Sequence, residues 1–217
     1  MFILVIYTGF TSDNFFTKNN FMNILMNMSS RLVIALGIAG CVITAGCDLS
    51  AGRMIGFGAC ISGMLLQRMD YSGKFFPDMQ PLNVFVVALI AMLVCAAFGT
   101  VTGFFIAYLN VPPFIATLAM MEIVYGIGLI VTNATPLGGY VEQYTNVSNG
   151  KFLGINYLIW IAIIVAAITW FIFNMTRHGK YMYAIGGNPQ AAEVAGVPVK
   201  ATLILIYMKA AAMYGLA

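Results

Sequence analysis

Long apolar runs without a charge alternate with short polar connections along this chain. No Asp, Glu, Lys or Arg occurs from residue 79 to residue 121, and Pro112 with its following proline divides this run. A helix needs about 20 apolar residues to cross the hydrocarbon core of a bilayer. We therefore predict spanning helices over residues 82–109 and 113–132. Another charge-free run predicts a third span over residues 156–174.

The first half of the chain is less regular. Residues 32–47 and 54–67 are also charge-free, but each run is short for a full crossing. The polar segment Asp48-Leu49-Ser50-Ala51-Gly52-Arg53 separates them. Either the two helices turn at the membrane surface here, or the polar turn lies at depth. Non-helical backbone is tolerated at depth only against protein or a water-filled cavity.

Apolar segments stand at both ends of the chain. Residues 1–10 are too few to span and are typical of the tail of a helix. Residues 199–217 begin another apolar helix, interrupted by Lys209, which must face protein or water if the helix inserts normally. The pattern predicts an all-α, polytopic transmembrane bundle with about six to seven membrane segments. We expect one transmembrane domain over residues 1–217, incomplete at the C-terminus and at the N-terminus.

Composition supports a membrane protein. Hydrophobic residues make up 61% of the 217 residues, charged residues only 8%, and the mean hydropathy is +0.92. A soluble domain carries about 25% charged residues. The net charge of +3 comes from scattered basic residues, which argues against a nucleic-acid partner.

Few residues in this chain are suited to catalysis. The cysteines Cys41, Cys47, Cys60 and Cys95 lie in or beside apolar runs without a C-x-x-C pair, so we interpret them as packing residues. A single histidine, His178, suffices for neither a zinc cluster nor a serine triad. No G-x-x-x-x-G-K-[ST] phosphate loop occurs. We expect no catalytic residue, no metal and no cofactor.

A polar segment over residues 177–198 carries its own helix signals. Asn188 can cap a helix, Pro189 suits its first position, and Gly196 suits the residue beyond its end. The predicted helix of about two turns, residues 189–195, is too short to be stable alone. One interpretation is a connection lying on the lipid headgroups. Because Ala191 and Ala192 give it a small face without bulky anchors, we favour docking into another protein.

The basic residues predict the orientation. The connection over 175–198 contains Arg177 and Lys180, and Lys200 follows it closely. In the connection over 133–155, the only basic residue is Lys151. The positive-inside rule therefore places 175–198 in the cytoplasm. Counting back places the N-terminus and 110–112 inside, and 11–31, 68–81 and 133–155 outside.

Three blocks in the same order resemble a known family. G-C-D-L-S-A-G-R at 46–53, A-Y-L-N-V-P-P-F-I-A-T-L at 107–118 and A-I-G-G-N-P-Q-A-A at 184–192 are similar to segments of bacterial ABC-type monosaccharide permeases of the ribose/xylose/galactose group. Within this group the likeness is greatest to galactose/methyl-galactoside permeases. Members of the family continue well beyond the position of residue 217.

The resemblance implies a permease subunit of an ATP-driven sugar importer in the bacterial inner membrane. Its implied partners are a second permease copy, an ABC ATPase dimer, a periplasmic or lipoprotein sugar-binding protein, the monosaccharide and membrane lipid. By the same resemblance, the loop over 177–198 contacts the ATPase. The coupling residues would be Gly187, Asn188, Pro189, Ala191, Ala192, Glu193 and Gly196.

Polar residues next to the apolar runs are candidates for the substrate pathway. We assign to it Asp48, Ser50, Arg53, Asn110 and Glu122. Asp48 or Ser50 could instead cap the next helix while Arg53 pairs with Asp48 or reaches the headgroups. Asn110 could simply end its helix, and Glu122 could face neighbouring helices.

Two other functions remain open from the sequence. A proton-coupled secondary transporter could use Glu122 or Asp48 as its proton carrier. A truncated permease remnant that does not transport would also explain the two cut ends.

Overall fold

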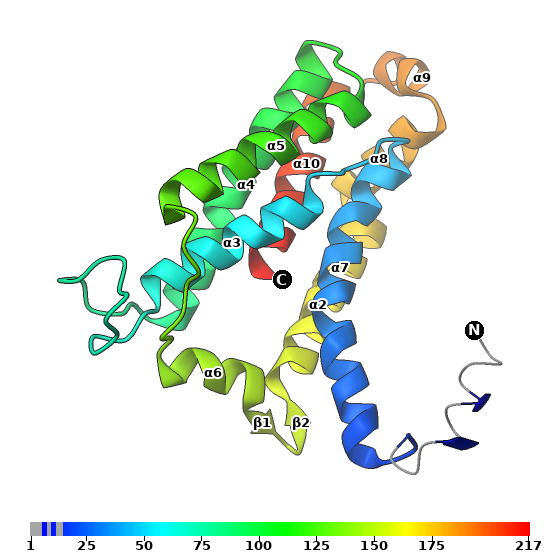
Figure 1. The fold of residues 1–217 in the computed structure, drawn as a ribbon. Helices are drawn as coiled ribbons and strands as arrows, with labels where there is room; N and C mark the ends of the chain where they lie inside the picture. The colour runs from blue at the N-terminus through cyan, green and yellow to red at the C-terminus, as the bar shows by residue number, and fades with distance from the viewer. Residues whose placement is uncertain (1–5, 8–9, 12–14) are drawn as a thin grey trace.

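The computed structural model describes residues 6–7, 10–11 and 15–217, and helices make up most of this part (Figure 1). The elements in chain order are α2 (Lys18–Ile43), α3 (Ala51–Leu65), α4 (Val84–Tyr108), α5 (Pro113–Thr132), α6 (Glu142–Asn149), β1 (Lys151–Phe152), β2 (Ile155–Asn156), α7 (Tyr157–Met175), α8 (Arg177–Gly187), α9 (Pro189–Val194) and α10 (Val199–Leu216). The two strands form a small antiparallel hairpin.

Five of the described helices, α2, α4, α5, α7 and α10, are long and apolar enough to cross a membrane. The helix α3 is apolar but shorter, with 15 residues. The three spans predicted from charge-free runs are confirmed, within two residues at each end for α4, α5 and α7. The expected all-α, polytopic architecture is therefore present.

Two predicted connections were wrong, because helices form there. The helix α2 begins at Lys18 and continues through the exposed Arg31, whereas the prediction started it at residue 32 and placed residues 11–31 in a connection. The Thr17 side chain caps its start by accepting from the backbone N–H of Asn20. The predicted helix tail over residues 1–10 falls largely outside the described residues.

The first part of the polar segment 177–198 is the helix α8, where the sequence predicted a loop. Its buried residues Gly179, Met182 and Ile185 recur every three positions, so one narrow face packs on the bundle and the other positions are exposed or half-buried. The side chain of Thr176 caps the helix at the N–H of Gly179. A sparse apolar stripe of this kind is easily read as a loop.

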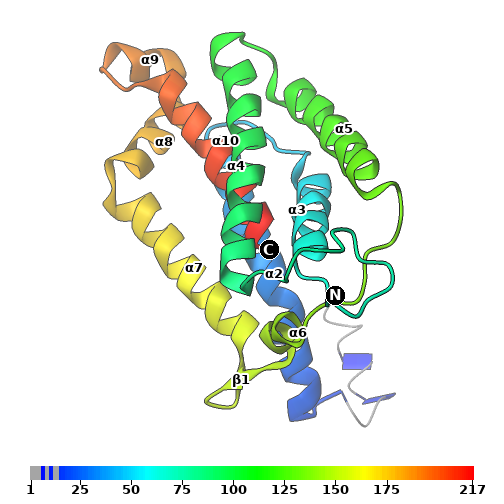
Figure 2. The same cartoon turned by 90° about the vertical axis from the view of Figure 1, so that its left-hand side faces the viewer.

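The connections gather at two ends of the bundle (Figure 2). At one end, α8 and α9 lie near the end of α4, and the Lys200 ammonium sits 5.2 Å from the centroid of the Tyr108 ring. At the other end, the 68–81 and 133–155 connections are in contact: the backbone N–H of Arg68 donates to the carbonyl oxygen of Gly139 at 2.8 Å. This arrangement agrees with the predicted grouping of 68–81 with 133–155 and of 110–112 with 175–198, whereas the predicted connection over 11–31 is mostly helix. The assignment of the α8–α9 end to the cytoplasm stays a prediction.

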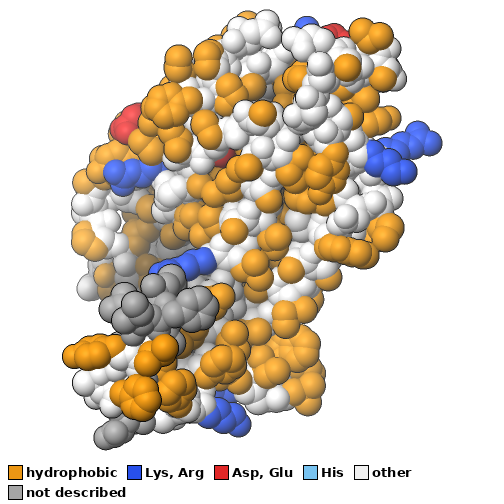
Figure 3. Space-filling model, turned by 90° about the vertical axis from the view of Figure 1, so that its right-hand side faces the viewer, with side chains coloured by type: hydrophobic (Ala, Val, Ile, Leu, Met, Phe, Trp, Pro, Cys, Tyr) orange, Lys and Arg blue, Asp and Glu red, His pale blue; other side chains and the backbone are white. Residues whose placement is uncertain are grey.

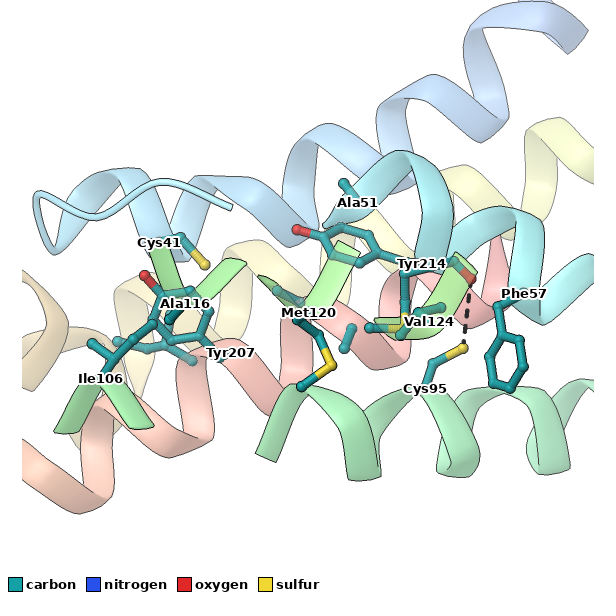
Figure 4. Packing of buried hydrophobic residues seen from close by; sticks show 14 of the residues in the cluster. Cys41, Ala51, Phe57, Cys95, Ile106, Ala116, Met120, Val124, Tyr207 and Tyr214 are labelled. Atoms are coloured by element: carbon teal, nitrogen blue, oxygen red, sulfur yellow. Dashed lines mark hydrogen bonds between the residues drawn. The ribbon is translucent and has the colours of Figure 1, made fainter. Parts of the chain in front are cut away.

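The core lies where α10 packs against α4, with α2, α3 and α5 around them (Figure 4). Small residues allow the α4 and α10 backbones to approach closely. A Cβ added at Gly99 would meet the carbonyl of Tyr207 and would lie 2.5 Å from the Cβ of Ala211. One at Gly103 would lie 2.7 Å from the Cα of Ile204. The G-x-x-x-G pair of α4, Gly99 and Gly103, thus packs directly against α10.

We predict that Gly99→Ala lowers the free energy of unfolding by about 1–3 kcal/mol, because α10 must move away from α4. Gly126→Ala in α5 is the matched control, since a Cβ there meets nothing within 4 Å. Both changes gain the same helix propensity, so their difference isolates the packing. Thermal unfolding in detergent measures it, and equal midpoints for the two variants would contradict the packing.

Candidate functional site

The polar turn between α2 and α3 is held by a buried carboxylate. Asp48 is only 8% exposed. Its Oδ1 accepts hydrogen bonds from the N–H of Ser50 at 3.0 Å and from the Ser50 hydroxyl at 2.6 Å. Its Oδ2 accepts one from the hydroxyl of Tyr214 in α10 at 3.0 Å. Both carboxylate oxygens are therefore occupied, and they join the turn to a helix more than 160 residues later in the chain.

The turn lies at the depth of the spanning helices. Tyr207, whose hydroxyl donates to the carbonyl of Cys47 at 3.4 Å, is the ninth residue of the 18-residue helix α10. The thiol of Cys95, the twelfth of 25 residues in α4, lies 3.8 Å from the carbonyl oxygen of Met54 near the start of α3 (Figure 4). The structure favours the alternative in which the polar turn is buried against protein at membrane depth. Buried donors then replace the water that non-helical backbone lacks there.

Asp48 and Arg53 do not pair, contrary to one alternative drawn from the sequence. The guanidinium carbon of Arg53 instead lies 3.9 Å from the centroid of the Tyr125 ring on α5, a cation–π contact. Ser50 stands at the N-cap position of α3 without a side-chain bond to the helix. Asp48 thus fixes the turn ahead of the helix, and Arg53 points to a different face.

Arg53 belongs to an exposed face formed by α3 and α5, which we call the α3/α5 face and define by Gly52, Arg53, Gly56, Glu122 and Tyr125. All five residues are exposed, and nothing lies within 4 Å of a Cβ added at either glycine. Glu122 is the tenth residue of the 20-residue helix α5 and stands one turn before Tyr125. One alternative drawn from the sequence expected Glu122 to face neighbouring helices, but its side chain is exposed.

Asn110 lies away from the polar turn, in the connection between α4 and α5. It adopts the left-handed conformation with φ 52°, and the N–H of the following Val111 donates to the carbonyl of Phe105 at 3.2 Å. A left-handed Asn just past a helix is a common way to end it. The geometry accordingly favours the helix-ending role for Asn110 over a substrate contact.

The short helix α9 forms as its sequence signals predict. The side chain of Asn188 accepts from the N–H of Ala191 at 2.9 Å, and Pro189 occupies the first turn. The helix ends at Val194, one residue earlier than predicted, and Gly196 has φ +83°. Ala192 is the buried residue of this helix, whereas Val194 is 91% exposed.

The histidine and the four cysteines lie apart from the polar turn's hydrogen bonds to Asp48. Among the described residues, no group of His, Cys, Asp and Glu could hold a metal ion, and the four cysteines are free. The ring of His178 on α8 is half-buried, and its Nε2 has no hydrogen-bond partner among the described residues. Burial, and secondarily the charge of Lys209, lower the pKa of His178 to about 4. The imidazole is therefore neutral at physiological pH.

Lys209 shows how α10 tolerates a charge. Its ammonium lies 5.5 Å from the centroid of the Phe173 ring on α7, in a small cavity between α2, α7 and α10. It therefore faces protein, one of the possibilities left open by the sequence.

Sequence reasoning missed the tyrosines. Tyr207 and Tyr214 hold the polar turn, and Tyr125 holds Arg53. Two tyrosines seven residues apart in an apolar helix lie on one face, and this spacing is the signal that could have identified the first two.

We predict that Tyr214→Phe lowers the free energy of unfolding by about 1.5–3 kcal/mol, the range for hydrogen bonds to charged groups. Tyr207→Phe is the control, since its longer bond to a carbonyl oxygen should contribute less. Asp48→Asn alone should also destabilise the fold. The loss of stability in the double variant, Asp48→Asn with Tyr214→Phe, should be smaller than the sum of the two single losses, because both changes break the same hydrogen bond. Thermal unfolding and the amount of folded protein in the membrane measure these effects. A normally folded, equally stable Asp48→Asn variant would contradict this anchoring role.

Comparisons with known proteins agree with the resemblance seen in the sequence. The chain is 42% identical over 223 residues to the galactose/methyl galactoside import permease protein MglC of Haemophilus influenzae, covering 98% of this chain and 66% of that protein. It is 40% identical to the MglC protein of Escherichia coli K12, with 99% and 66% covered. The ribose import permease protein RbsC of Escherichia coli K12 is 31% identical, with 95% and 62% covered. No solved structure matches.

The chain spans about two thirds of the length of these relatives. A family model described as the permease component of the branched-chain amino acid transport system matches residues 20–217. This range includes the polar turn, the α3/α5 face and the α8–α9 segment. The chain therefore belongs to this family of transport-system permease components.

Proposed function

We propose that the chain is a permease subunit of an ATP-driven sugar importer in the bacterial inner membrane. The proposal is supported by the relatives at 40–42% identity, whose names describe import permeases for galactose and methyl galactoside. The second group of relatives is named for ribose. The substrate class would then be a monosaccharide, brought to the outer face by a separate sugar-binding protein and carried across within surrounding lipid.

The observation that carries this proposal is the form of α9. A helix of six residues cannot stand alone, and only its Ala192 is buried against the rest of the chain. Its Val194 is 91% exposed, and Glu193 is exposed beside it. An isolated apolar side chain at the tip of a capped helix suits insertion into a groove of another protein.

The groove would belong to a dimer of ABC ATPase subunits, because this chain contains no phosphate-binding loop and must receive its energy from a partner. The coupling residues are Gly187, Asn188, Pro189, Ala191, Ala192, Glu193 and Gly196. Asn188 and Pro189 shape α9, and Gly196 closes it with a positive φ. The chain itself would then have no enzymatic activity.

The route of the sugar would follow the α3/α5 face. Both oxygens of Asp48 are already bonded, and Asn110 ends α4, whereas Arg53 and Glu122 are exposed at mid-span. An exposed charge at the centre of a lipid-facing helix costs about 2.5–3.5 kcal/mol on insertion scales. These side chains are therefore expected to face water or another protein. Asp48 and Ser50 would not contact the sugar; they would position the α3 side of this route by fixing the start of α3.

We predict that Glu193→Arg and Val194→Asp weaken the association of the ATPase subunits by at least about tenfold, because both alter the exposed tip of α9. Co-purification of the ATPase, together with the ratio of ATP hydrolysed to galactose or ribose taken up, measures the effect. Glu142→Arg is the matched control, since it makes the same charge change on the short helix α6, at the end of the bundle opposite α9 (Figure 1). Gly196→Trp is less specific, because its positive φ strains any larger residue.

Three outcomes would contradict the proposal. Unchanged association and coupling in both α9 variants would remove the docking role. Sugar uptake that survives ATP depletion and collapses with the proton gradient would indicate a proton-coupled carrier using Glu122 or Asp48. Absence of any sugar uptake by a folded, ATPase-associated chain would indicate a non-transporting remnant.

A further inference from the structure

A groove lies between the first turns of α2 and the β1–β2 hairpin, and its volume is about 610 Å³. On the hairpin side it is lined by Lys151 and Gly154. On the α2 side its lining residues recur three and four positions apart and therefore share one face of the helix. After Lys18, which also lines the groove, they are Asn19, Met22, Asn23 and Met26.

Two positive charges line this groove, one from each side. Lys18 is the first residue of α2, and Lys151 is the first residue of β1. Both side chains are exposed, and neither takes part in a salt bridge within the described part of the chain. None of the residues that line the groove is acidic. Because two ammonium groups at one groove repel each other, an anion placed between them is attracted by both.

The groove changes from polar to apolar along α2. Lys18 stands at the start of the helix, whereas Met26 lies eight residues further, about 12 Å along the helix axis. Met22 and Met26 are half-buried, and their flexible side chains adapt to irregular apolar groups. Since α2 is long and apolar enough to cross a membrane, this direction leads from the end of the bundle toward the membrane interior. A phospholipid has the same order, with its phosphate outermost and its acyl chains below.

Exposed hydrophobic side chains surround the groove. They are Phe16 and Phe21 beside the start of α2, and Phe152 and Leu153 in the hairpin. The indole N–H of Trp160 on α7 donates to the carbonyl oxygen of Phe152 at 3.3 Å and so ties the hairpin to a spanning helix. Aromatic residues at the ends of spanning helices are typical of the membrane–water boundary. Figure 3 shows a mostly hydrophobic face, whose visible acidic side chains lie toward the end opposite the hairpin.

We propose that this groove binds one anionic phospholipid, with its phosphate between Lys18 and Lys151 and the start of an acyl chain against the two methionines. The side-chain amides of Asn19 and Asn23 can donate to phosphate or ester oxygens. Lipid surrounds every spanning helix, whereas this site holds a single molecule and selects it by the charge of its headgroup. The orientation expected from the basic residues would place the site in the outer leaflet. The proposal does not depend on sugar transport.

Native mass spectrometry of the purified chain in a non-ionic detergent tests the site, with dioleoyl-phosphatidylglycerol or dioleoyl-phosphatidylcholine added at equal concentration. We expect one phosphatidylglycerol to stay bound at collision energies that remove phosphatidylcholine. Lys18→Gln and Lys151→Gln should each weaken the affinity for phosphatidylglycerol about fivefold. Lys180→Gln is the matched control, because it removes the same charge from an exposed lysine on α8, at the other end of the bundle. It should leave the affinity unchanged.

A further variant separates a built groove from general attraction to a positive protein. Asn23→Leu keeps both lysines and removes one amide, and it should also weaken the binding of phosphatidylglycerol. Equal losses in all three lysine variants, with none in Asn23→Leu, would show attraction by net charge alone and overturn the proposal. Unchanged thermal midpoints without added lipid confirm that the variants are folded.

Inorganic phosphate distinguishes the two possible sources of the anion. Binding of phosphatidylglycerol should raise the thermal midpoint of the chain, since a ligand that binds only the folded state stabilises it. Inorganic phosphate at the same concentration should give no such rise, because it lacks the acyl chain that contacts the methionines. An equal rise with inorganic phosphate, or equal retention of the two phospholipids, would contradict a phospholipid site.

Discussion

The carboxylate of Asp48 carries the constraint on which the rest of the bundle depends. Backbone that leaves a helix at membrane depth loses its hydrogen-bond partners and finds no water to replace them. Asp48 supplies acceptors on both sides, to Ser50 within the turn and to Tyr214 on α10. Tyr207 donates to the carbonyl of Cys47. The turn between α2 and α3 is therefore fixed to the last helix of the described chain.

The position of this turn determines which charged residue of α3 is exposed on the outside of the bundle. Because α3 starts at mid-depth, its third residue, Arg53, is exposed at a level where charge is costly. It contacts Tyr125 of α5 and thereby aligns α3 and α5 into one face. The close packing of α4 on α10 holds the other side of the same assembly. The polar turn, the exposed charges and the α9 tip are thus placed by one scaffold.

The sequence predicted the parts that depend on local chemistry. The spans α4, α5 and α7 follow from charge-free runs, and α9 follows from the cap at Asn188 and the positive φ of Gly196. It failed where tertiary contacts decide. The charge of Arg31 marked a false helix boundary, since an exposed arginine does not interrupt a helix. The spacing of Tyr207 and Tyr214 marks a common face of α10, but it does not show that this face meets Asp48, because Tyr214 lies 166 residues later in the chain.

Depth-dependent quenching tests the location of the polar turn most directly. A fluorophore attached to a cysteine replacing the partly exposed Leu49, in a chain without its native cysteines, is reconstituted with lipids brominated at defined positions along the acyl chain. The structure predicts the strongest quenching by bromines near the middle of the bilayer. Strongest quenching by bromines next to the headgroups would put the turn at the surface and contradict its burial at membrane depth against Tyr207 and Tyr214 of α10.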